Sequence, residues 1–228
     1  MGITIHYSIA EDSTVSDMVK KLEAVRQMCL DLPFENVDEV KHIVYTPSDI
    51  AFFNSLQEEC FCPNNTIENL EKRDQAIIDR GLDLWTLIEI SFKFESKRIE
   101  NNIDVIHWGV WTGKGCEDTT FSFMREQGTD GPFECKSFTK TQFAEELVKC
   151  HLLVIKVLDL LQEQGFKAEV NDEGDFWKTR DYKVLGKNIN ISTSLITSVF
   201  GALKQATEGT DAVVESPIKD CKNYMKTE

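Results

Sequence analysis

The segment 112–118, Thr-Gly-Lys-Gly-Cys-Glu-Asp, holds the residue types that come closest to a reactive site in this chain. Gly113 and Gly115 allow the backbone to take positive φ angles or to approach another group closely. Cys116 supplies a thiol and Glu117 a carboxylate directly after them. This pattern suggests a nucleophilic cysteine on a glycine-flanked loop, and the alternative is a tight turn around a structural cysteine.

A cysteine attacks as the thiolate, so a nucleophilic Cys116 needs a base beside it. His107 lies on the strand that we expect before the loop, and His151 lies on a later helix. Either imidazole could serve as the base if the fold brings it close, with Glu117 orienting it. The sequence thus raises a thiol-dependent hydrolase or transferase with Cys116, His107 and Glu117 as candidate catalytic residues.

The same loop is a candidate ligand site. Trp108 and Trp111 precede it, and aromatic walls with a few polar groups are typical of small-molecule pockets. We expect Trp108, Trp111, Gly113 and Gly115 to line such a cleft if one exists. A phosphate-binding loop is excluded, because Gly113-Lys114-Gly115 lacks the required spacing and the Lys-Ser/Thr pair that would follow it.

Metal binding has weaker support. Cys60 and Cys62 are spaced too closely for a usual zinc half-site, and no second pair of ligands exists to complete one. The acidic run 172–175 has a misplaced glycine and no distal Glu, so it does not fit a calcium loop, and Asp175 is expected to cap a helix instead. We expect no metal and no cofactor.

The elements around the loop are predicted from periodicity. Alternating or continuous apolar stretches predict strands over 3–9, 40–45, 85–95, 103–111, 119–125 and 166–170. Helical spacing and capping signals predict helices over 14–30, 47–59, 66–80, 139–164 and 175–185, and one from 192 or 193 to 209. The strand 103–111 is apolar on both faces and should be central in the sheet. These elements predict an α+β fold: a mainly antiparallel sheet with helices packed on it.

Composition limits the function further. Thirty-nine acidic against 25 basic residues give a net charge of −14, which disfavours nucleic acid and anionic membrane surfaces as partners. Seven cysteines, an odd number, without a signal peptide favour a cytoplasmic protein with reduced thiols. We expect one domain over 1–228, possible subdomains meeting near 126–138, and an oligomeric state that the sequence leaves open.

The segment Trp111-x-Gly113-x-Gly115-Cys116-Glu117 resembles one found in a group of bacterial proteins of unassigned function. The turn 61–63, Phe-Cys-Pro, and the region 177–204 are similar to that group as well. This resemblance implies no reaction, cofactor or ligand. The first functional hypothesis is therefore a non-catalytic protein that binds a small ligand or a protein partner, and the thiol-dependent enzyme is the alternative.

Overall fold

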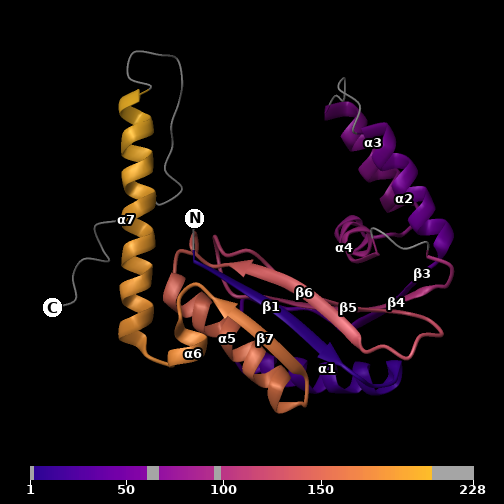
Figure 1. The fold of residues 1–228 in the computed structure, drawn as a ribbon, viewed down its shortest axis with the longest axis horizontal. Coiled ribbons are helices and arrows are strands. Elements are labelled where there is room, and N and C mark those ends of the chain that lie inside the picture. Colours follow the sequence, from indigo (N-terminus) through magenta and orange to yellow (C-terminus); the bar gives the residue numbers. More distant parts are fainter. Residues whose placement is uncertain (1–2, 61–66, 95–98, 207–228) are drawn as a thin grey trace.

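A computed structural model describes residues 3–60, 67–94 and 99–206, and over these residues it has the predicted α+β fold (Figure 1). Seven strands form one antiparallel sheet: β1 (Thr4–Glu11), β2 (Asn36–Val37), β3 (Lys41–Tyr45), β4 (Ile103–Trp111), β5 (Thr119–Glu126), β6 (Phe133–Lys140) and β7 (Lys167–Asp172). Seven helices accompany it: α1 (Val15–Leu30), α2 (Pro47–Cys60), α3 (Ile67–Asp79), α4 (Leu84–Phe94), α5 (Leu147–Glu163), α6 (Phe176–Thr179) and α7 (Tyr182–Ala206).

The strands run in the order β2-β4-β5-β6-β1-β7, and β3 also pairs with β4. β4 therefore has β2 and β3 along one edge and β5 along the other. Seven of its nine residues are buried, which confirms the prediction of a central strand over 103–111. The predicted strand over 119–125 is confirmed as β5.

The sheet has a separate hydrophobic core on each face. On one face α1 and α5 pack against β1, β4 and β5, with residues such as Leu22, Leu158, Trp108 and Phe121 fully buried. On the other face α2, α3 and α4 cover β3, β4 and part of β5. In Figure 1 these three helices lie on the opposite side of the sheet from α1 and α5, while α7 rises away from the sheet.

The predicted strand over 85–95 is wrong, because this segment forms helix α4. Its apolar residues fit a period of two and a helical period equally well. The start of the helix decides between them: Asp83 caps it by accepting a hydrogen bond from Thr86 N–H at 2.7 Å. Leu87 and Ile90, three residues apart, are then both fully buried against the sheet.

The predicted helix over 139–164 begins later than expected. α5 starts at Leu147, and residues 133–140 form β6, which pairs with β1 over its whole length. Thr139 lies in that strand and donates a hydrogen bond to the Thr119 hydroxyl at 3.2 Å, so it caps no helix. Gln142 instead accepts a hydrogen bond from Ile3 N–H at 2.7 Å.

The C-terminal helices also differ from the prediction. The segment 175–185 does not form one helix. α6 ends before Arg180, which has a φ of 52° in the left-handed region and so cannot continue the helix. α7 then runs without interruption through Gly186, where the sequence predicts a stop. Asp175 makes no side-chain cap, whereas Asp172 accepts a hydrogen bond from Trp177 N–H at 2.8 Å.

Candidate functional site

The loop after β4 is held against the segment that precedes α5. Gly115 has a φ of 78°, and a Cβ at this position would collide with the carbonyl oxygen of Phe143. Glu145 N–H donates to Lys114 C=O at 2.9 Å, which fixes the outer side of the loop. Gly115 therefore serves close packing between the loop and the segment before α5.

This packing brings Cys116 together with Cys150, in the first turn of α5. The two thiols hydrogen-bond each other and form a small buried cluster with Ala144. A Cβ at Gly113 would lie 3.1 Å from Cys150 Sγ, so a side chain there would crowd the pair. The sequence marked Cys116 but missed Cys150 as its neighbour, because only the fold brings the loop to the helix.

The two thiols have different acidities. The contact with Cys150, together with burial, raises the pKa of Cys116. The same contact lowers the pKa of Cys150 to about 7, helped by the Lys149 ammonium and opposed by burial. The first turn of a helix also favours a negative charge. Of the two thiols, Cys150 therefore has the surroundings that favour ionisation.

Glu117 holds the loop to the end of β6. Its carboxylate accepts a hydrogen bond from Lys140 N–H at 3.0 Å, and its own N–H donates to Lys140 C=O at 3.3 Å. The Glu117 carboxylate therefore has a structural role, because it holds the loop to the backbone at the end of β6. The structure gives Glu117 no contact with an imidazole.

The structure does not bring His107 to Cys116. His107 lies on β4 four residues before Trp111, a distance of about 13 Å along a strand. It shares the face of Val105, which packs under α2–α4, whereas Cys116 meets α5 on the other face. His107 Nδ1 lies instead 3.1 Å from the Ser122 hydroxyl.

His151 is fully buried and tied to other groups. Its Nδ1 lies 3.2 Å from Thr141 Oγ1, and its Nε2 lies 3.2 Å from Asp172 Oδ1. Thr141 and Asp172 are themselves almost completely buried. This Thr-His-Asp set resembles a catalytic triad in composition, but its role here is to connect the ends of β6, α5 and β7.

The two tryptophans lie apart from any cleft at the loop. Trp108 is fully buried in the α1–α5 core, where its ring stacks on Phe121 with centroids 5.4 Å apart. Trp111 is half-buried and pairs with Asn36 of β2, while its carbonyl accepts a hydrogen bond from Glu35 N–H.

A layer of buried polar groups that sequence reasoning missed lies between α4 and the sheet. The Glu89 carboxyl reaches the Ser122 hydroxyl, and burial raises the pKa of Glu89. Burial also lowers the pKa of His107. The hydroxyls of Tyr45 and Ser91 and one Glu89 oxygen are buried without a hydrogen-bond partner in the described part of the chain. The strand predicted over 85–95 gave no indication of this layer, which depends on the segment forming helix α4.

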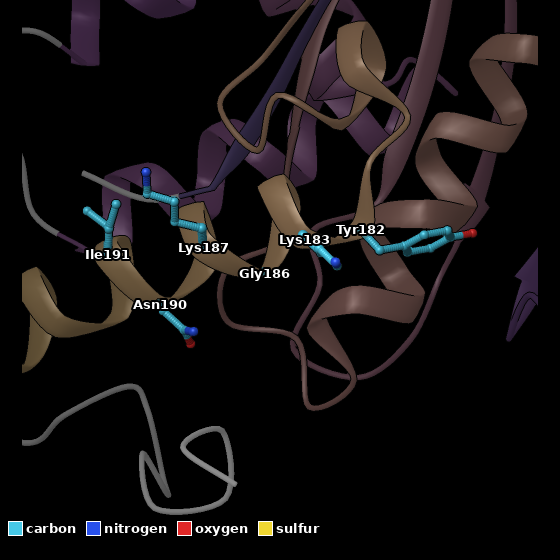
Figure 2. A pocket seen from close by; sticks show the side chains of 6 residues that line it. All are labelled: Tyr182, Lys183, Gly186, Lys187, Asn190 and Ile191. Carbon is cyan, nitrogen blue, oxygen red and sulfur yellow. The ribbon is translucent and has the colours of Figure 1, made fainter. Parts of the chain in front are cut away.

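A series of exposed apolar residues lies on α7. We define the α7 row as Lys183, Lys187, Ile191, Leu195 and Val199, which recur every four residues. The three apolar members are 50%, 48% and 44% exposed. An open hollow of about 610 Å³ lies along the first half of the row and is lined by Tyr182, Lys183, Gly186, Lys187, Asn190 and Ile191 (Figure 2).

α7 is anchored at one side only. Leu185 and Ile189 are buried in the core, and the Asn188 amide donates to Gly174 C=O at 3.1 Å. In Figure 2 the Lys187 and Ile191 side chains point to the same side of the helix. The α7 row lies away from these anchors, and because residues four apart advance by about 40° around an α-helix, it winds along the exposed part of the helix from Lys183 to Val199.

Searches against protein-family models, curated proteins and solved structures find no match to this chain. Within the described ranges no cluster of three or more His, Cys, Asp or Glu side chains could hold a metal ion. The Cys60-x-Cys62 pair extends outside those ranges. No helix in the searched residues combines the length and the apolar character that a membrane span needs.

Proposed function

We propose that this chain is a non-catalytic, intracellular binding protein whose α7 row holds a partner protein. The occupant would be a helical segment with apolar side chains flanked by carboxylates. The observation that carries the proposal is the run of Ile191, Leu195 and Val199, each more than two fifths exposed at four-residue spacing. Rows of this kind are how a helix presents anchors to a helical partner.

Charge supports an acidic occupant. The chain as a whole carries a net charge of −14, yet α7 contains three lysines and no Asp or Glu. Lys183 and Lys187 line the hollow that leads into the apolar part of the row. Complementary charges around an apolar centre steer association and fix its register.

Length supports a segment of defined size. At about 1.5 Å per residue, the α7 row extends over about 24 Å from Lys183 to Val199. A helical segment of about 16 residues would match that length. Its leucine-like side chains would meet Ile191, Leu195 and Val199, and its carboxylates would meet the two lysines.

The catalytic alternative has less support. A hydrolase or transferase that uses Cys116 needs a base at that thiol, and both His107 and His151 are committed to other partners. Cys116 also has a raised pKa, which disfavours the thiolate that would attack. Iodoacetamide labelling distinguishes the two: a catalytic Cys116 would react near neutral pH much faster than every other cysteine.

Fluorescence anisotropy with two designed peptides tests the proposal. Both are 16-residue amphipathic helices with the same leucine row, flanked by Glu in one and by Lys in the other. The full chain should bind the Glu peptide at least tenfold more tightly. Leu195→Ser should weaken that binding several-fold, whereas Thr197→Ser, a change at an exposed α7 position off the row, should leave it unchanged.

Four results would contradict the proposal. Equal binding of the two peptides would remove the charge argument, and binding unaffected by Leu195→Ser would place the site elsewhere. A dimer in light scattering that dissociates with Leu195→Ser would show that a second copy is the occupant. Binding to vesicles of phosphatidylserine and phosphatidylcholine, lost in the same variant, would show that a membrane surface takes the partner's place.

A further inference from the structure

The second feature with chemical potential is the thiol pair, which is separate from the α7 row. Cys116 and Cys150 come from a loop and a helix that are distant in the sequence, and their side chains hydrogen-bond each other. Cys116 Sγ also lies 3.8 Å from Lys140 O, and Cys150 Sγ lies 3.5 Å from Thr112 O, its acceptor when it is protonated. The two sulfurs thus share one small buried space.

The backbone around the pair is built for this approach. Gly115 leaves room for the Phe143 carbonyl and Gly113 leaves room for Cys150 Sγ, as a Cβ at either position would crowd its neighbour. A cysteine that served only as core would not need two glycines to deliver it to a second thiol. Cys29 and Cys135 illustrate the contrast, because each is buried among apolar side chains of the main core.

The two sulfurs differ in acidity, and the lower pKa makes Cys150 the better nucleophile of the two. The contact with Cys116 lowers the pKa of Cys150 to about 7, against the effect of burial. The same contact and burial raise the pKa of Cys116. By contrast, burial raises the pKa of Cys29 and of Cys135 to about 12.

We propose that Cys116 and Cys150 form a reversible redox site that a small hydroperoxide, such as hydrogen peroxide, oxidises to a disulfide. Access favours a small oxidant, because Cys116 is 8% exposed and Cys150 is 1% exposed. The product would bond the loop between β4 and β5 covalently to the first turn of α5. The site does not depend on the function proposed for the α7 row.

The reaction takes two steps. The Cys150 thiolate attacks one oxygen of hydrogen peroxide, an S–O bond forms, the O–O bond breaks, and the departing hydroxide is protonated to water. Cys116 sulfur then attacks the resulting sulfenic acid, the S–S bond forms, and hydroxide leaves with the Cys116 proton as water. One peroxide is reduced by two electrons and one dithiol is oxidised; two equivalents of an added thiol reverse the change.

Peptide mapping under non-reducing conditions tests the site in the full chain. One equivalent of hydrogen peroxide should produce a Cys116–Cys150 disulfide, seen as a mass loss of two hydrogens. Dithiothreitol should reduce the disulfide and restore the original mass. In Cys116→Ser the oxidation should stop at a Cys150 sulfenic acid that dimedone traps. Cys29→Ser and Cys135→Ser, the matched controls, should still form the disulfide.

Wild-type protein alone supplies a second measurement, which holds even if a variant fails to fold. Iodoacetamide should label Cys150 with a rate that rises about a midpoint near pH 7, while Cys29 and Cys135 stay unreactive up to pH 9. Peroxide that forms other disulfides, or none before the chain unfolds, would overturn the proposal. Labelling of Cys150 no faster than that of Cys135 at pH 7 would overturn it as well.

Discussion

Glu89 of α4 and His107 of β4 reach the same hydroxyl, that of Ser122. Burial raises the pKa of Glu89, and the Ser122 hydroxyl, which donates to the Glu89 carboxylate, opposes that shift. Burial lowers the pKa of His107 as well, so burial disfavours the charged form of both groups. The layer between α4 and the sheet therefore holds an acid and a base whose charged forms are both disfavoured by burial.

Glu89→Gln should make the protein more stable at high pH. A raised carboxyl pKa contributes stability that is present below the ordinary pKa and is lost as pH rises through the folded-state pKa. The amide keeps a polar group at Ser122 without the charge, so urea unfolding at pH 8 should show a gain of about 1 kcal/mol. The gain should vanish at pH 4. Glu169→Gln, at an exposed carboxylate, should change neither value, and a variant destabilised at pH 8 would contradict this account.

Two glycine substitutions should act in opposite directions. Gly186 lies inside α7, and no atom within 4 Å would meet a Cβ there. Gly186→Ala should raise the free energy of unfolding by about 0.5–1 kcal/mol, the usual helix preference for alanine. Gly115→Ala should lower it by more than about 1 kcal/mol, because φ is positive and Phe143 blocks the methyl group. Urea titration of both variants measures this, and effects of the same sign would be inconsistent with the loop packing.

Asp172→Asn should cost about 3 kcal/mol of unfolding free energy at pH 7, the usual loss when one member of a buried pair is removed. Burial alone would raise the pKa of Asp172, but the His151 ring and the N–H groups of Trp177 and Gly174 outweigh it and hold that pKa down. A lowered carboxyl pKa contributes stability above the ordinary pKa that is lost as pH falls. The cost should therefore shrink below pH 4. Asp175→Asn, at an exposed aspartate, is the control, and a cost independent of pH would contradict the assignment.

The fold class and most elements could be predicted from periodicity, and the errors have physical reasons. Residues 85–95 satisfy both strand and helix periods, and the cap that decides between them, Asp83, lies outside the stretch. β6 alternates Phe133 and Cys135 with polar residues but loses its apolar side at Ser137, so its pattern is weak. Its partner β1 is distant in the chain, and only tertiary pairing defines it.

The candidate site could be predicted only in part, because chemistry here depends on contacts between distant segments. The sequence marks Cys116 and its flanking glycines, but the second thiol, Cys150, reads as one more small residue of an apolar helix. The α7 row was hidden by the predicted stop at Gly186, which divides one long helix into two. Ile191 and Leu195 are exposed because of the way α7 packs on the rest of the protein, and the local sequence does not show this.

A charge-swap experiment tests the central claim about the α7 row most directly. The Lys183→Glu, Lys187→Glu double variant keeps the apolar row and reverses its flanking charge. In fluorescence anisotropy it should bind the Lys peptide at least tenfold more tightly than the Glu peptide, the inverse of the wild-type preference, and added salt should weaken both complexes. If the variant keeps the wild-type preference, or if neither protein binds either peptide, α7 does not hold an acidic helical partner.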